Sequence, residues 1–253
     1  MSGQRRVVPA AVRVGLPLLG VFVAGIALSG LHRPSGVAAG VDDPAAVAGL
    51  CWAGQLWYVG WVLGVEGAEA RRYWPLGPAD VITLLRGGLY AVVAGFVVVP
   101  PETSLSWVPA LAYGAGTLLD YVDGLVARTV GTETRVGERL DISFDAFGVV
   151  AAPLVAVLWG QLPVWYLSLS AARYVYVGAL ARRQYDDRPL FDEPDSDLGR
   201  YLAGVQMVFL TAALVPVTPT NLIWTVAPLL LGASLSVFVR DFLVVTGRLR
   251  AYY

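Results

Sequence analysis

The sequence predicts an all-α integral membrane protein, and two observations support this fold class. Of its 253 residues, 57% are hydrophobic and only 15% are charged, a balance unlike that of an ordinary soluble domain. The apolar residues also gather into runs of about 20, the length that an α-helix needs to cross roughly 30 Å of hydrocarbon. A multi-pass bundle in contact with membrane lipids is therefore expected, with no nucleic acid as a partner.

Apolar runs long enough, or nearly long enough, to cross a membrane recur along the whole chain. In order they are Val14–Leu31, Ala45–Val65, Val81–Val99, Trp107–Arg128, Leu140–Gly160, Val164–Leu180, Tyr201–Val215 and Leu222–Val245. The seventh run is short, so we expect its helix to begin earlier, near Leu198. Each run is interpreted as one transmembrane helix.

The first run has a second interpretation. Arg5 and Arg6 precede it and small residues follow it, a pattern that also resembles a cleaved signal peptide. Its length favours a retained helix, because the apolar part of a signal peptide is shorter. Cleavage would leave the orientation of the later spans unchanged.

Arginine positions predict the orientation of the bundle, because cytoplasmic loops next to membrane spans carry the excess of positive charge. In an eight-span zigzag, one side receives Arg5, Arg6, Arg71, Arg72, Arg135, Arg139, Arg182, Arg183, Arg188, Arg200, Arg248 and Arg250. The other side receives Arg33, together with the interfacial tryptophans Trp107, Trp159, Trp165 and Trp224. We therefore expect a protein of the cell membrane with both termini in the cytoplasm.

Four aspartates lie between the fourth and fifth runs, on the side predicted to be cytoplasmic. Asp120 and Asp123 are three residues apart and share a helix face. Asp141 and Asp145 are four residues apart and share a face of the next helix. A short polar turn joins the two helices, so all four carboxylates can meet.

Carboxylates this close together require cations. Two unit charges about 4 Å apart repel by about 4 kcal/mol at an effective dielectric constant near 20. Arg128 and Arg139 can neutralise part of the charge. Oxygen ligands with no histidine or thiol nearby favour one or two Mg²⁺ or Mn²⁺ ions over zinc. Gly124 and Ala127 leave space on the carboxylate face, and hard metals take up phosphate oxygens, so a phosphate-bearing substrate is expected.

These residues also follow a fixed spacing. They are Asp120, Asp123, Gly124, Ala127, Arg128, Gly137, Asp141 and Asp145. Their pattern, D-x2-D-G-x2-A-R-x8-G-x3-D-x3-D, resembles the signature of the CDP-alcohol phosphotransferases at every fixed position. Two further stretches strengthen the resemblance. Residues 78–86 resemble the family's P-N-x-x-T-x-x-R opening, with Asp80 in place of Asn, and Gly199, Arg200 and Gln206 resemble its G-K-x-K-T-x-x-Q stretch.

The resemblance covers about residues 75–245. It implies a six-helix membrane domain over residues 75–253, preceded by an extension, residues 1–74, with two additional spans. It also implies that Asp120 and Asp141 bridge two divalent ions, that Asp123 completes the first ion site, and that Asp145 binds the second ion and acts as general base. The CDP moiety would contact Asp80, Val81, Ile82, Thr83, Gly124, Ala127, Arg128, Thr134 and Gly137. An acceptor hydroxyl would attack the phosphorus nearer the lipid, and CMP would leave.

Arginines near the cytoplasmic ends of the later spans are candidates for holding a phosphorylated acceptor, such as glycerol 3-phosphate or inositol phosphate. These candidates are Arg182, Arg183, Arg200 and Arg240. Positive-inside topology alone also explains the first two, and an ion pair with Asp241 also explains Arg240. Arg173, inside the sixth span, has either a carboxylate or an interfacial partner.

Three functions remain open from the sequence. The leading one transfers a phosphatidyl-type group, diester or diether, from a CDP-activated lipid to a small polar alcohol. The second, within the same family, transfers phosphocholine or phosphoethanolamine from a soluble CDP-alcohol to a diradylglycerol. The third is an ion-coupled transporter, which gives Gly124, Ala127, Arg128 and Gly137 no role. A homodimer also remains open.

Overall fold

The computed structural model describes residues 43–72, 78–130, 135–191 and 197–249, and within these residues it contains helices and no strands. The helices are α2 (Pro44–Arg72), α3 (Pro78–Gly95), α4 (Val108–Val130), α5 (Arg135–Leu158), α6 (Ser168–Tyr185), α7 (Asp197–Leu214) and α8 (Thr220–Val245). Two short 3-10 segments, η1 (Phe96–Val98) and η2 (Val164–Leu167), follow α3 and precede α6. The all-α prediction is confirmed for the described part of the chain.

Four helical stretches are long and apolar enough to cross a membrane, which fits an integral membrane protein. They are Pro44–Gly64, Asp80–Val98, Arg139–Leu158 and Thr220–Val245. The seventh helix begins at Asp197, close to the expected start near Leu198. The run Val14–Leu31 lies outside the described residues, and the number of spans stays a prediction.

The helices extend beyond some of the apolar runs. Helix α2 continues past Val65 to Arg72, and α5 begins at Arg135 rather than Leu140. The added residues are largely glutamate, arginine and alanine, which are good helix formers, so a helix does not have to stop where its apolar run stops. Hydrophobicity therefore predicted which segments form helices better than it predicted helix ends.

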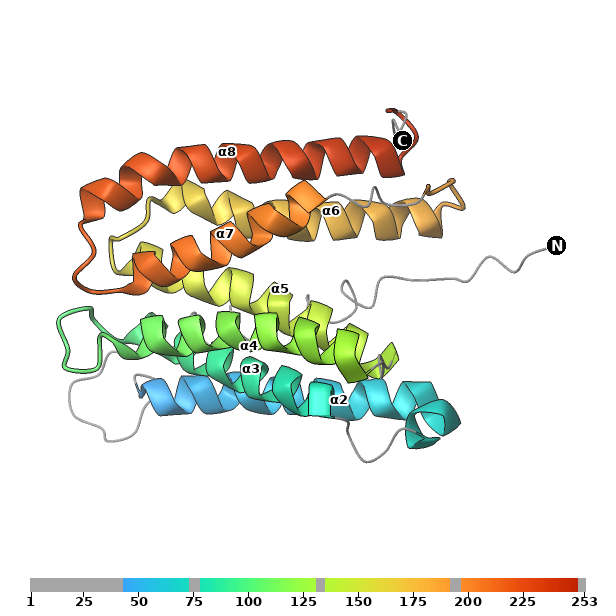
Figure 1. The fold of residues 1–253 in the computed structure, drawn as a ribbon, viewed down its shortest axis with the longest axis horizontal. Helices are drawn as coiled ribbons and strands as arrows, with labels where there is room; N and C mark the ends of the chain where they lie inside the picture. The colour runs from blue at the N-terminus through green and yellow to red at the C-terminus, as the bar shows by residue number, and fades with distance from the viewer. Residues whose placement is uncertain (1–42, 73–77, 131–134, 192–196, 250–253) are drawn as a thin grey trace, which may run out of the picture.

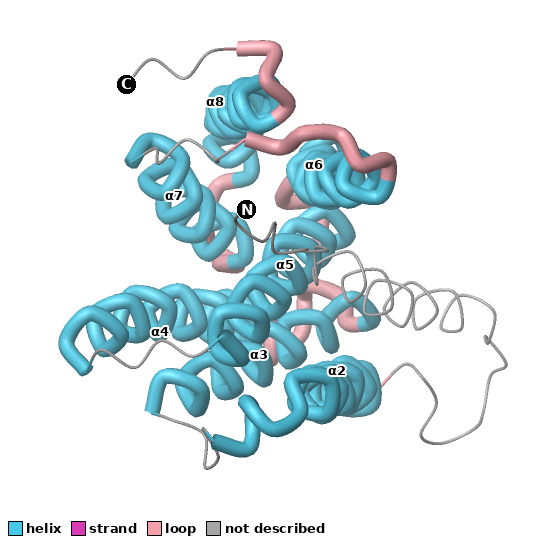
Figure 2. The backbone as a smooth tube through the Cα atoms, turned by 90° about the vertical axis from the view of Figure 1, so that its right-hand side faces the viewer, coloured by secondary structure: helices cyan, strands magenta, loops and turns pink. Residues whose placement is uncertain are grey.

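Helix α5 lies in the middle of the bundle, with α2, α3 and α4 on one side and α6, α7 and α8 on the other (Figure 2). Successive helices alternate in direction, so α3, α5 and α7 begin at the end of the bundle where α4, α6 and α8 finish (Figure 1). We call this end the Asp145 end. Because of this alternation, residues early in α3, α5 and α7 lie at the same level as residues late in α4 and α8.

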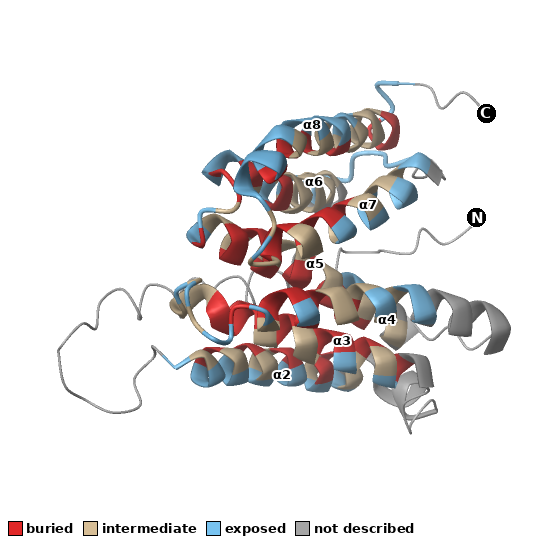
Figure 3. Cartoon of the chain, turned by 60° about the vertical axis from the view of Figure 1, so that its left-hand side comes forward, coloured by how far each residue is buried: buried red, intermediate tan, exposed pale blue. Residues whose placement is uncertain are grey.

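Buried residues gather where the helices face one another, and exposed residues lie on the outer faces of the helices (Figure 3). Small residues of α5, including Ala152 and Ala156, are fully covered, which allows neighbouring helices to approach closely. Helix α8 instead exposes large apolar side chains such as Leu229 and Val239 along its outer face. An apolar outer face is what contact with lipid tails requires.

The opposite end of the bundle is closed by a tryptophan and a glycine. The indole N–H of Trp159 donates a 2.8 Å hydrogen bond to the carbonyl of Val99, joining the end of α5 to the end of the α3–η1 segment. Gly160 follows with φ +71°, a left-handed conformation that favours glycine and ends α5. Trp107, Trp165 and Trp224 are exposed near this end, as expected for interfacial anchors.

Candidate active site

Four charged side chains from three helices meet near the Asp145 end. Arg86 of α3 donates from Nη1 to Asp120 of α4 at 2.5 Å, and from Nη2 to Asp141 and Asp145 of α5 at 2.5 and 2.6 Å. The Arg86 side chain is 0% exposed, whereas those of Asp120, Asp141 and Asp145 are 37%, 38% and 21% exposed. The arginine therefore lies on the inner side of the cluster, and the carboxylates form its accessible side.

A layer of aromatic and glycine residues lies one helical turn from the charged cluster. This layer sets the spacing of α3, α4 and α5. Tyr90, four residues after Arg86, is 1% exposed and packs into a slot between α4 and α5. A Cβ at Gly116 would lie 2.6 Å from the Tyr90 ring, and one at Gly148 would lie 2.7 Å from it. Only glycine at both positions leaves room for the ring. This close packing of the three helices brings the side chains of the charged cluster together.

Helix α2 packs against the part of α5 that carries Asp141 and Asp145. Ser143, between Asp141 and Asp145, donates a 2.8 Å hydrogen bond to the carbonyl of Arg139, and its hydroxyl is also hydrogen-bonded to the hydroxyl of Tyr58 at 3.2 Å. Tyr58 is buried with Val59 and Val62 of α2 against α5. The face of α5 opposite the cluster is thus fixed by packing.

The donor set fits divalent cations. One oxygen from each of Asp120, Asp141 and Asp145 lies within 4.8 Å of the others. Three carboxylates and one guanidinium leave a formal charge of −2, and all the available ligand atoms are carboxylate oxygens, which Mg²⁺ and Mn²⁺ prefer. The partial exposure of these carboxylates gives an ion a way in.

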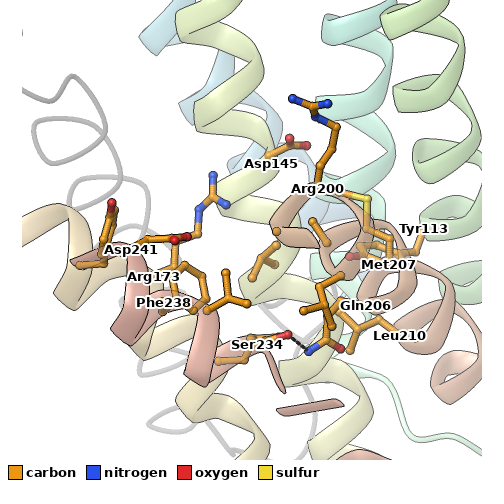
Figure 4. A pocket seen from close by; sticks show the side chains of 17 residues that line it. Tyr113, Asp145, Arg173, Arg200, Gln206, Met207, Leu210, Ser234, Phe238 and Asp241 are labelled. Atoms are coloured by element: carbon orange, nitrogen blue, oxygen red, sulfur yellow. Dashed lines mark hydrogen bonds between the residues drawn. The ribbon is translucent and has the colours of Figure 1, made fainter. Parts of the chain in front are cut away.

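A cavity of about 560 Å³ opens beside the cluster and reaches between α4, α5, α6, α7 and α8. Asp145, Arg173 and Arg200 line it near the cluster, and Asp241 lines its α8 side (Figure 4). Most other lining residues are apolar, such as Leu210 and Phe238. The cavity therefore combines cationic groups near the carboxylates with apolar walls.

The inner part of this cavity carries a chain of hydrogen bonds. The Tyr166 hydroxyl donates to Oε1 of Gln206 at 2.5 Å. Nε2 of Gln206 in turn donates to Oγ of Ser234 at 3.0 Å (Figure 4). All three residues are buried. Their pairing satisfies polar groups that would be costly to leave alone among apolar side chains.

Comparison with known families decides the class of this site. A family model for CDP-alcohol phosphatidyltransferase matches residues 77–246, well over half of the chain. The chain belongs to the CDP-alcohol phosphatidyltransferase family. Comparisons with curated proteins and with solved structures give no match.

CDP-alcohol phosphatidyltransferases are membrane transferases of phospholipid biosynthesis that move a substituted phosphate group from a CDP-alcohol to an alcohol acceptor. They use divalent metal ions, consistent with the carboxylate cluster. Family membership makes this chain an enzyme, so the transporter hypothesis is not needed. The match begins at residue 77, so helix α2, which packs behind the cluster, lies outside it.

The start of α3 lies one to two helical turns before Arg86. Asp80 and Thr83 are buried on the face of α3 that also carries Arg86, while Val81 is exposed and Ile82 is half-buried. Gly137 is half-buried in the first turn of α5. Thr134 and the side chains of Asp123, Gly124, Ala127 and Arg128 lie outside the described residues, so their predicted roles stay predictions.

The four arginines suggested for the acceptor separate in the structure. Arg200 alone among them lines the 560 Å³ cavity. Arg182 is highly exposed, and its Nε lies 3.9 Å from Oδ2 of Asp186. Nη2 of Arg183 donates to the carbonyls of Pro189 and Thr246. Arg240 forms a 2.7 Å ion pair with Asp241, as its structural interpretation anticipated. Arg173, whose partner was left open above, lines the cavity with Arg200.

Arg86 is the site residue that sequence reasoning left without a role. The sequence placed it at the end of the family's opening stretch, six residues after Asp80. A stronger signal was present, because Arg86 is the charged residue within an otherwise apolar span, and such residues pair or mark functional sites. Its partners lie 34 to 59 residues away, so only the fold identifies them.

Substituting alanine for Gly148 is expected to reduce activity by at least about tenfold. A Cβ 2.7 Å from Tyr90 forces that ring to move, and the α3–α5 distance then increases near Asp145. Initial rates of CMP release from purified protein measure the effect. Gly178→Ala, where a Cβ meets nothing within 4 Å, is the matched control, and equal rates for both variants would contradict the spacing role of the Tyr90 slot.

Proposed function

We propose that this enzyme transfers a phosphatidyl-type group, a diester- or diether-glycerol phosphate, from a CDP-activated lipid to a small polar alcohol and releases CMP. The acceptor is proposed to be phosphorylated, such as glycerol 3-phosphate or inositol phosphate. The observation that carries the proposal is the cavity, which joins Asp145 to Arg173 and Arg200 and continues between apolar walls. Such a cavity suits an anionic acceptor beside a lipid chain.

The donor half of the site is proposed from the cluster and the start of α3. Asp120, Asp123, Asp141 and Asp145 would hold two Mg²⁺ or Mn²⁺ ions, which when bound would neutralise the pyrophosphate of the donor. The CDP moiety would lie against residues 80–83 of α3 and against Gly124, Ala127, Arg128, Thr134 and Gly137. Supporting this assignment, Asp80 and Thr83 face the same interior as Arg86.

The proposed chemistry centres on Asp145, the carboxylate that both joins the Arg86 cluster and lines the cavity. Asp145 takes the proton of the acceptor hydroxyl, whose oxygen forms a bond to the phosphorus nearer the lipid. The bond from that phosphorus to the oxygen of CMP breaks, and CMP leaves. Asp145 is 21% exposed, which allows contact with an acceptor while limiting access of water.

Arg200 and Arg173 are proposed to bind the acceptor phosphate, because both line the cavity that Asp145 enters. Guanidinium groups suit phosphate through paired hydrogen bonds. Arg182, Arg183 and Arg240 do not line this cavity, and their contacts with Asp186, backbone carbonyls and Asp241 support structural or topological roles. The acceptor proposal therefore rests on two arginines from α6 and α7.

We further propose the membrane arrangement that the arginine distribution predicts. Eight spans would place both termini and the Asp145 end of the bundle in the cytoplasm of a cell-membrane protein. Residues 75–253 would form the six-helix catalytic domain, and residues 1–74 an extension with two spans. Supporting this arrangement, Arg182 lies in the last turn of α6 and Arg200 in the first turn of α7, both at the Asp145 end of the bundle.

Purified enzyme in nanodiscs, supplied with Mn²⁺ or Mg²⁺, a CDP-lipid and one acceptor at a time, tests this function. The panel is glycerol 3-phosphate, inositol phosphate, serine and inositol, with diester and diether donors compared. CMP release that depends on a phosphorylated acceptor supports the proposal. Turnover only with a soluble CDP-alcohol and a diradylglycerol would replace it with the phosphocholine-type reaction.

Arg200→Ala is expected to raise the KM for the acceptor at least about tenfold while changing the KM for the CDP-lipid by less than about threefold. The reason is that Arg200 lines the proposed acceptor cavity and not the start of α3. Steady-state kinetics with each substrate varied in turn measure both constants. The control is Arg188→Ala, an exposed loop arginine paired with Asp186. Equal effects on both KM values would contradict the acceptor assignment.

A further inference from the structure

The position of Arg86 distinguishes it from the other arginines that the structure describes. Its guanidinium contacts one Oδ1 atom on each of Asp120, Asp141 and Asp145, and its side chain has no exposed surface. The three carboxylates reach it from two different helices, α4 and α5. One cation from a third helix thus joins all three described acidic groups of the proposed metal site.

Without a cation at this position, the carboxylates would repel each other strongly. Their oxygens lie within 4.8 Å of one another and are only partly exposed, so water screens their charges incompletely. Arginine keeps its charge under all physiological conditions, and its planar fork can serve several carboxylate oxygens at once. Arg86 therefore provides a permanent positive charge where repulsion is greatest.

The fold holds Arg86 in place on the inner side of the cluster. Gly87, the next residue, packs so closely against α5 that a Cβ there would lie 2.8 Å from the ring of Phe144. One turn further, Tyr90 is held between Gly116 and Gly148. The aspartates are the partly exposed members of the cluster, so a divalent ion approaches them from the side away from Arg86.

We infer that Arg86 is a positioning residue that holds Asp120, Asp141 and Asp145 together in the metal-free enzyme and opposes the binding of divalent ions to them. The inference rests on the proposed metal site and deepens it. With Arg86 present, the metal-free cluster is stable, but the guanidinium charge repels an ion that binds to the same carboxylates. Without Arg86, the metal-free cluster is strained, and an ion relieves that strain.

This dual effect gives a thermodynamic signature that a purely structural residue lacks. A substitution that destabilises the metal-free protein more than the metal-bound protein must tighten metal binding by the same free energy, because the two equilibria are linked. We expect Arg86→Gln to lower Tm markedly in chelator and much less in saturating Mn²⁺. We also expect it to tighten Mn²⁺ binding by about tenfold or more.

Both quantities can be measured on the full-length protein in nanodiscs without any substrate. Thermal unfolding is followed by tryptophan fluorescence in EDTA and in saturating Mn²⁺, and Mn²⁺ affinity is measured from the electron paramagnetic resonance signal of the free ion. Arg183→Gln is the control, because this arginine contacts backbone carbonyls away from the cluster. Its effect on Tm should be the same with and without Mn²⁺.

Two further variants keep the inference testable if Arg86→Gln does not fold. Arg86→Lys retains the charge and should shift Tm in chelator and Mn²⁺ affinity in the same directions, by smaller amounts. Adding Asp120→Asn to Arg86→Gln removes one of the repelling charges and should restore folding in chelator. Failure of the double variant to regain stability would overturn the role assigned to charge repulsion.

The outcomes separate this inference from the proposed function. Equal losses of Tm in both conditions with unchanged Mn²⁺ affinity would show a merely structural Arg86 and overturn the inference. Weaker Mn²⁺ binding by Arg86→Gln would also overturn it, because Arg86 would then assist metal binding. Absence of Mn²⁺ binding to the unmodified enzyme would overturn the proposed metal site itself.

Discussion

Asp145→Asn is expected to lower the rate of CMP release by at least about 10³-fold while the protein remains folded. An amide cannot take the proton of the acceptor hydroxyl, and it is a poorer ligand for a hard cation. Asparagine keeps the size of the side chain, and Arg86 retains Asp120 and Asp141 as partners. The loss should therefore appear in kcat and not in the amount of folded enzyme.

Single-turnover CMP release, measured on protein whose elution and thermal unfolding match those of the unmodified enzyme, tests this expectation. Asp186→Asn, which changes a carboxylate in an exposed loop, is the matched control and should leave the rate unchanged. Turnover by Asp145→Asn within a few-fold of the unmodified enzyme would remove Asp145 from the role of general base.

Removing divalent ions is expected to abolish transfer, with a loss of at least about 10³-fold. Asp120, Asp141 and Asp145 present clustered carboxylate oxygens with a formal excess of negative charge, even after Arg86 is counted. A donor pyrophosphate adds more negative charge and would be repelled from this region without cations. The chemical step and donor binding should therefore both fail in chelator.

The measurement compares initial rates in EDTA, after EDTA with excess Mg²⁺, and after EDTA with excess Mn²⁺. Recovery after either ion shows that the loss comes from the metal and not from unfolding. Equal activity with and without chelator would contradict the metal assignment and leave the cluster as a purely structural ion pair network.

The helices of this fold were largely predictable because the bilayer imposes a simple requirement on sequence. A span needs an apolar run of sufficient length, and the runs beginning at Ala45, Val81 and Leu222 correspond to α2, α3 and α8. Helix ends were less predictable, since α2 continues through charged residues to Arg72. Hydrophobicity governs which residues enter the membrane, whereas helix propensity and capping govern where a helix stops.

The carboxylate cluster was predictable because its members are close in sequence. Asp120 lies on one helix, and Asp141 and Asp145 lie on the next helix along the chain. The four-residue spacing of Asp141 and Asp145 alone places them on one helix face. The contact with Arg86 was not predictable in this way, because it depends on how α3 packs against α4 and α5. The Tyr90 slot is likewise a property of three helices that no local pattern reveals.

The proposed acceptor cavity shows a similar limit of prediction from sequence. Sequence position suggested that arginines at cytoplasmic helix ends form one pocket, yet Arg200 lines the cavity and Arg182 points to Asp186. Residues near the same end of the bundle still face different directions around their helices. Position along a helix was available from the sequence, and the direction of each side chain came only from the packing of α6, α7 and α8.

The fate of one phosphorus atom distinguishes transfer of the lipid phosphate from other reactions of the donor. A CDP-lipid labelled with ³²P at the phosphate nearer the lipid is incubated with purified enzyme, Mn²⁺ and the preferred acceptor, and the products are separated. We expect the label to be retained in the new phospholipid and equimolar, unlabelled CMP to be released only when acceptor is present. Recovery of the label in the lipid phosphate monoester, the product of donor hydrolysis, would contradict this expectation. Release of CMP at the same rate without acceptor would also contradict it.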